Sequence, residues 1–105
     1  MNRRVIYETV RQHLLTQRAK SQTGGDCLYR GPNGLKCAIG CLIPDEVYKP
    51  DMESLDVMGM LKLWPNHPFS DIRDLFLRDL QCIHDNLEPE YWTSALDDFA
   101  HRYNL

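Results

Sequence analysis

The stretch Cys27–Tyr48, CLYRGPNGLKCAIGCLIPDEVY, decides the fold that we expect for this chain. It holds three of the four cysteines, three of the six glycines and the least polar run of the sequence. Its GPNG segment (31–34) fits a turn, because proline suits the second turn position and Asn33 tolerates a positive φ. We therefore predict a short β-hairpin with arms at 27–30 and 35–36. Two strands alone are marginally stable, so this hairpin should lie on helices.

The following run, CAIGCLI at 37–43, fits two kinds of element. A helix and a strand both place Cys37 and Cys41 on one face. Pro44 ends the run, and the PDE sequence at 44–46 resembles the first turn of a helix, with proline at N1 and acids near the positive end of the dipole. We favour helix on both sides, with a kink at Pro44.

Helical periodicity covers most of the remaining chain. The spacing of apolar residues predicts a first helix over residues 2–20 and short helical turns joined by loops over residues 49–69. Ser70 fits the N-cap of a long helix, and Pro89 fits the first turn of the last helix. We expect a mainly α protein of the α+β class, with about four helices packed around a short two-stranded β-hairpin. The length is that of a single domain, residues 1–105.

Two histidines fall on the apolar faces of these predicted helices. His13 lies on the apolar side of the first helix, and His84 points into the apolar arc of the long helix, whereas Cys82 points away from it. A buried histidine whose ring is satisfied by neighbouring groups is commoner than a catalytic one.

The net charge of −3 is unevenly distributed along the chain. Residues 1–36 carry seven basic and two acidic side chains, whereas residues 37–105 carry five basic and thirteen acidic ones. Together with a pI of 5.7, this argues against binding of duplex nucleic acid. An acidic second half fits docking on a basic protein surface. The residues that we expect to contact such a partner are Glu90, Asp97, Asp98 and His101.

No apolar run approaches the ~18–20 residues that span a bilayer, so we expect no membrane partner. The N-terminus turns polar directly after its first basic residues, unlike a secretory signal. We expect the protein in the cytosol, where thiols stay reduced, and we expect it to need no cofactor.

The cysteines allow a zinc site as one alternative. Its ligands would be Cys27, Cys37 and Cys41, with either Cys82 or His84 as the fourth. The spacing of the cysteines lacks the paired C-x2-C knuckles of structural zinc sites. Free, buried cysteine is the interpretation that we favour, because cysteine is among the most buried residue types.

Nucleophilic catalysis is a second alternative. If residues 37–43 form a helix, Cys37 lies at its N-terminus beside Lys36, where the thiolate is favoured. An inward-facing His84 could then serve as the base, with an acid such as Asp45 or Glu46 orienting it.

Several short motifs form a wider pattern. They are YRG at 29–31, G-x-KCAIG at 34–40, LIPDE-x-Y at 42–48, LQ-x-IHD at 80–85 and the later Trp92. Over roughly the last three quarters of the chain, this pattern resembles small uncharacterised proteins of tailed bacteriophages and prophages. The resemblance implies an intracellular phage accessory protein that binds a host protein or complex stoichiometrically, inhibits or redirects it, and acts on host machinery or host defence.

Two other functions stand beside this leading hypothesis. One is a cysteine-dependent hydrolase or transferase that uses Cys37 and His84. The other is a small-ligand sponge that binds a signalling nucleotide through Arg30 and Lys36.

Overall fold

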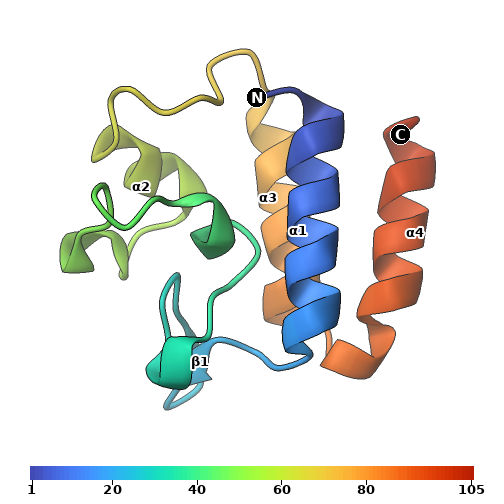
Figure 1. Ribbon diagram of the computed structural model, residues 1–105, viewed down its shortest axis with the longest axis horizontal. Coiled ribbons are helices and arrows are strands. Elements are labelled where there is room, and N and C mark those ends of the chain that lie inside the picture. Colours follow the sequence, from blue (N-terminus) through green and yellow to red (C-terminus); the bar gives the residue numbers. More distant parts are fainter.

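Three long helices form one side of the molecule (Figure 1). They are α1 (Arg3–Gln17), α3 (Asp74–Asn86) and α4 (Trp92–Arg102), and each contacts the other two. The short helix α2 (Val57–Lys62) and several turns form the other side, and α2 contacts α3. This computed structural model describes all residues, 1–105, and it confirms the predicted fold class.

Helix α1 forms because its apolar residues recur at helical spacing. Ile6, Val10 and Leu14 are fully buried, each four residues from the next. The Asn2 side chain caps the helix by accepting the backbone N–H of Val5 at 2.9 Å. The helix ends at Gln17, earlier than the predicted residue 20, because Arg18 adopts the left-handed conformation with φ 53°.

The two-stranded sheet forms around the Gly24-Gly25 turn, before the GPNG segment around which it was predicted. Strand β1 (Gln22–Thr23) pairs antiparallel with β2 (Asp26–Cys27), and Gly24 and Gly25 form the turn between them. Both glycines have positive φ, 56° and 86°, which is what a two-residue hairpin turn of the I′ type requires.

The predicted GPNG turn is present, but its arms form no sheet. A 3-10 turn (Pro32–Gly34) occupies the segment, and a single antiparallel bridge joins Arg30 to Lys36. The expectation that Asn33 tolerates a positive φ is confirmed, since its φ is 60°.

The prediction that residues 37–43 form an α-helix was wrong. Only Gly40–Leu42 form a 3-10 turn, η2, and residues 44–48 form a single helical turn closed by the carbonyl of Pro44. The N–H groups of Cys41, Leu42 and Ile43 donate to carbonyls within the segment, whereas two others bond to side chains. The N–H of Gly40 donates to Cys37 Sγ at 3.2 Å, and the N–H of Ile39 donates to Gln81 Oε1 at 2.9 Å.

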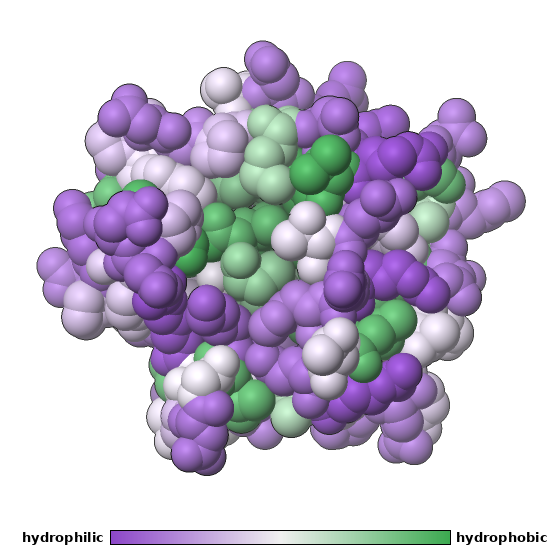
Figure 2. Space-filling model, viewed as in Figure 1, coloured by the Kyte–Doolittle hydropathy of each residue, from purple (hydrophilic) through white to green (hydrophobic).

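Gly40 also explains why this segment is compact. A Cβ atom at this position would lie 2.1 Å from the carbonyl oxygen of Tyr29, so only glycine lets the two backbones approach. The residues before it, Cys37, Ala38 and Ile39, are fully buried. Figure 2 shows hydrophobic residues gathered on the face of the molecule between α1 and α2, surrounded by polar ones.

One further prediction about the helices needs correction. Ser70 is not an N-cap, because residues 69–72 form a separate turn and α3 begins at Asp74. Within α3, Phe76 is buried, whereas its neighbour Leu75 is 60% exposed. The last helix is confirmed: a 3-10 turn (Pro89–Tyr91) leads into α4, whose apolar residues face the core.

The core joins all four helices. Its largest fully buried side chains include four aromatic rings and several aliphatic residues: Trp92, Phe69, Phe76, Phe99, Ile6, Leu14, Ile39, Met52, Met60, Leu77, Leu80 and Leu96. None of the helices combines the length and the apolar composition that crossing a bilayer requires.

Candidate functional site

His84 is the fully buried centre of a polar cluster at one end of α3. Its Nε2 lies 2.9 Å from the backbone N–H of Ser21, and its Nδ1 lies 2.8 Å from Asp85 Oδ1. Because a backbone N–H can only donate, Nε2 is the acceptor, and the proton of the neutral ring is on Nδ1, donated to Asp85. The ring also stacks on Trp92 at 5.6 Å. Both ring nitrogens are therefore engaged in holding the fold together.

This arrangement does not assemble the proposed catalytic set. Cys37 Sγ accepts the N–H of Gly40, and burial raises the pKa of this thiol to about 12. Asp45 lies on the surface, where it pairs with Arg30 at 2.7 Å, and no hydrogen bond links it to His84. Without a free ring nitrogen on His84 or an acid oriented toward it, these three residues cannot act as nucleophile, base and orienter.

The four cysteines do not assemble into a zinc site either. Cys37 is buried beside Gly40, and Cys41 Sγ donates to the carbonyl of Ala38 at 3.1 Å. Burial raises the pKa of Cys41 to about 12 as well. The one group of three possible metal ligands whose donor atoms lie within 4.8 Å of one another is Cys27, His84 and Asp85.

The sequence did not predict that the side chains of Cys27 and Asp85 lie close together. They face a crevice of about 190 Å³, which the exposed Cys82 also lines. Burial, followed by the neighbouring charge of Asp85, raises the pKa of the Cys27 thiol to about 11. The residues are 58 positions apart along the chain, so only the fold brings them together.

The residues expected to bind a nucleotide have other partners. The guanidinium of Arg30 donates to the carbonyl of Ile43 at 3.0 Å, pairs with Asp45 and lies over the ring of Tyr48 at 4.5 Å. Neither Arg30 nor Lys36 lines a cavity. The structure therefore shows no nucleotide-binding site formed by Arg30 and Lys36 together.

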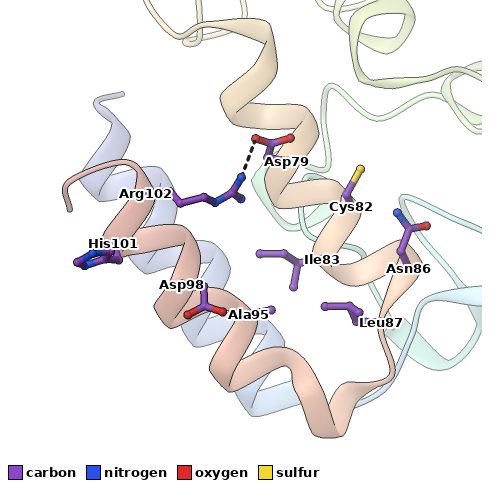
Figure 3. A pocket seen from close by; sticks show the side chains of 9 residues that line it. All are labelled: Asp79, Cys82, Ile83, Asn86, Leu87, Ala95, Asp98, His101 and Arg102. Carbon is purple, nitrogen blue, oxygen red and sulfur yellow. Dashed lines mark ion pairs between the residues drawn. The ribbon is translucent and has the colours of Figure 1, made fainter.

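A groove of about 620 Å³ runs between α3 and α4, on the side of these helices away from α1 (Figure 3). Ile83, Leu87 and Ala95 form its apolar part. The polar residues that line it are Asp79, Cys82, Asn86, Asp98, His101 and Arg102.

Two of the four expected partner-binding residues, Asp98 and His101, line this groove and are exposed. Asp97 is exposed but pairs with Arg11 on α1 at 2.9 Å, outside the groove. Glu90 lies in the turn before α4 and is also exposed. Asp98 and Glu90 form no ion pair within the chain, so both carboxylates are available to another molecule.

Comparison of the chain with protein-family models, with curated proteins and with solved structures finds no match.

Proposed function

We propose that this protein acts by stoichiometric binding to a host protein or complex, and that the groove between α3 and α4 receives a basic amphipathic segment of that partner. The observation that carries the proposal is the groove itself. It combines an apolar floor with an exposed carboxylate, Asp98, which no cation of the chain neutralises.

The shape of the groove fits a helical ligand. Helices α3 and α4 pack against each other and against α1, so their outer faces leave a furrow between two parallel ridges (Figure 3). An amphipathic helix laid along such a furrow buries its apolar face on Ile83, Leu87 and Ala95. This adds a fourth helix to the bundle of α1, α3 and α4, and four-helix bundles are a common packing arrangement.

The charge of the region favours a basic ligand. From residue 79 to the C-terminus the chain has six acidic side chains against one arginine. Asp79 lies 3.9 Å from that arginine, Arg102, and accepts a hydrogen bond from Tyr103 at 2.6 Å. Glu90 and Asp98 are left to attract lysine or arginine, which raises the association rate and orients the partner.

The resemblance to phage and prophage proteins supplies the biological context of the proposal. A phage protein that acts by binding would meet its partner in the bacterial cytosol, and host machinery or a defence complex is the expected target.

The test is affinity capture with charge-reversal variants. The tagged protein, Asp98→Lys and Glu46→Lys are incubated with bacterial lysate, and retained proteins are identified and quantified. Glu46 is the matched control, since it is exposed, forms no ion pair and lies outside the groove. We expect one protein to be retained at a fixed ratio by wild type and Glu46→Lys, and to be depleted at least about tenfold by Asp98→Lys.

A second measurement places the contact. The retained protein is purified, mixed with the chain carrying a photo-crosslinker on Cys82, which lines the groove, and the crosslinked peptide is sequenced. A crosslink to a basic helical segment supports the proposal. Equal capture by Asp98→Lys and wild type, or a crosslink only to acidic segments, contradicts it.

A further inference from the structure

The crevice that contains Cys27 has the donor atoms of a metal site on opposite walls. Helix α3 supplies Arg78, Gln81, Cys82 and Asp85 to one wall, at the i, i+3, i+4 and i+7 positions of a single helical face. Strand β2 supplies Cys27 to the other wall, and its sulfur lies within 4.8 Å of the ligand atoms of Asp85 and His84.

Hydrogen bonds already orient the carboxylate of Asp85. Its Oδ1 accepts Nδ1–H of His84 at 2.8 Å and Nε2–H of Gln81 at 3.1 Å. This leaves Oδ2 to face a ligand. Carboxylates that bind metals are commonly held by such outer hydrogen bonds, which fix their direction. His84 itself is not a ligand in this arrangement, because both of its nitrogens are engaged.

The charges of the residues that line the crevice also favour binding of a cation. Glu53 and Asp56 line it together with Asp85, and Arg78 is the one lysine or arginine among the lining residues. Glu53 and Asp56 are engaged in hydrogen bonds to backbone N–H groups, so they contribute negative potential and not ligand atoms.

We propose that Cys27, Cys82 and Asp85 bind one thiophilic divalent cation, Zn²⁺, with water in the fourth position. Cys82 lies one helical turn before Asp85, so the two side chains are neighbours on α3. Its sulfur lies outside the group of donor atoms within 4.8 Å of one another, so binding requires the Cys82 side chain to change rotamer toward Cys27. Two sulfurs and one carboxylate oxygen form a donor set that zinc accepts in tetrahedral geometry.

Binding is coupled to the loss of protons. Two neutral thiols become thiolates as they coordinate the cation, and each releases a proton to solvent, so one Zn²⁺ displaces two H⁺. The neighbouring charge that now disfavours the Cys27 thiolate comes from Asp85. A divalent cation between the two residues reverses this repulsion, because both then face a positive charge.

The site differs from the four-cysteine set considered from the sequence. It keeps Cys27 and Cys82 and replaces the two cysteines of the 37–43 segment with one carboxylate. Its position also matters, because Cys82 lines the α3–α4 groove as well as the crevice. A bound ion would fix Cys82 at the ridge between them.

The test uses reduced, metal-free protein titrated with Zn²⁺ and with Co²⁺ under anaerobic conditions. We expect one ion per chain, two protons released per Zn²⁺, and an intense thiolate-to-cobalt charge-transfer absorption. Cys82→Ser and Asp85→Asn should each weaken Zn²⁺ binding by about 10- to 100-fold. Cys41→Ser is the matched control, since this thiol lies outside the crevice, and it should bind as wild type does.

Cys82 is exposed in the fold, so we expect its serine variant to fold as wild type does. A loss of Zn²⁺ affinity in this variant then reports the missing ligand. Unchanged affinity in Cys82→Ser overturns the site as proposed, as does a Co²⁺ spectrum without the charge-transfer band. Equal weakening by Cys41→Ser also overturns it, because the metal would then bind elsewhere.

Discussion

His84 Nε2 accepts a hydrogen bond from the backbone N–H of Ser21 at 2.9 Å, and both residues are fully buried. The bond spans 63 positions of the chain and ties the segment before β1 to the C-terminal half of α3. Because the partner is a buried backbone donor, removing the imidazole leaves that N–H without its hydrogen-bond acceptor. This contact explains why a histidine lies on the apolar face of α3.

We expect His84→Ala to destabilise the fold by about 3 kcal/mol, since it leaves the Ser21 N–H unsatisfied and opens a cavity against Trp92. The measurement is the free energy of unfolding from urea titration. His101→Ala, at an exposed position, is the control and should change that free energy by less than about 0.5 kcal/mol. A similar small loss in His84→Ala would mean that the ring carries little of the fold's stability.

Gly40 gives a sharper prediction, because the obstacle is backbone. A Cβ atom at this position meets the carbonyl oxygen of Tyr29 at 2.1 Å, so Gly40→Ala should cost about 3 kcal/mol or more. Gly24→Ala is the control: its Cβ meets nothing within 4 Å, but its φ is 56°, so it should cost only about 1 kcal/mol of left-handed strain. Equal unfolding midpoints for the two variants would contradict the close approach of residues 29 and 40.

The elements that could be predicted from the sequence are those whose pattern is local. Trp92, Leu96 and Phe99 recur at helical spacing, and all three are fully buried in α4. The inward orientation of His84 and the exposure of Cys82 also follow from a helical wheel, and both are confirmed. Local periodicity is sufficient here because one helix face meets the core along its whole length.

The errors arise where contacts distant in sequence override local preference. The GPNG segment has turn chemistry as good as that of Gly24-Gly25, but only the latter leads into paired strands. Residues 37–43 have a helical pattern, but the N–H of Ile39 donates to the Gln81 side chain on α3, and the backbone bonds from Leu42 to Ile39 and from Ile43 to Gly40 close 3-10 turns. No local pattern contains the contact between Cys27 and Asp85, because it depends on how β2 packs on α3.

Glu53 should be the most sensitive carboxylate of the chain. It accepts the backbone N–H groups of Tyr29 at 2.8 Å and Arg30 at 3.0 Å, and the hydroxyl of Tyr48 at 2.6 Å. Glu53→Gln places an amide donor against these donors, so we expect a loss of about 2–4 kcal/mol in the free energy of unfolding. Asp51→Asn is the matched control on the exposed neighbouring turn and should have almost no effect. A small loss in Glu53→Gln would show that water replaces these bonds.

The thiols should differ widely in reactivity. Alkylation requires an accessible thiolate, and burial raises the pKa values of Cys37 and Cys41 to about 12. We expect iodoacetamide to modify the exposed Cys82 first in metal-free protein at neutral pH, with Cys37 modified only on unfolding. Peptide mass spectrometry over a time course measures each site. Labelling of Cys37 faster than a model thiol would instead revive the nucleophile hypothesis.

His13 should make the fold less stable in mild acid. Its Nε2 lies 2.9 Å from the carbonyl of Lys36 and donates to it, which ties α1 to the segment after the GPNG turn. Burial, more than any neighbouring charge, lowers the pKa of this ring from the ordinary value of 6.5. As the pH falls below 6.5, the unfolded chain therefore binds a proton that the folded chain resists, and the free energy of unfolding decreases.

Above pH 6.5 this contribution is fully present, because the ring is then neutral in both states. His13→Gln keeps a side-chain donor near the Lys36 carbonyl but cannot be protonated, so it should lose less stability than wild type between pH about 7.5 and about 5.5. His101→Gln, at an exposed position, should keep the wild-type slope. The measurement is the urea midpoint of each variant at several pH values in this range. Most carboxylates stay ionised there, so they contribute little to the difference in pH dependence between the variants. A slope for His13→Gln equal to that of wild type would place the acid sensitivity at another group.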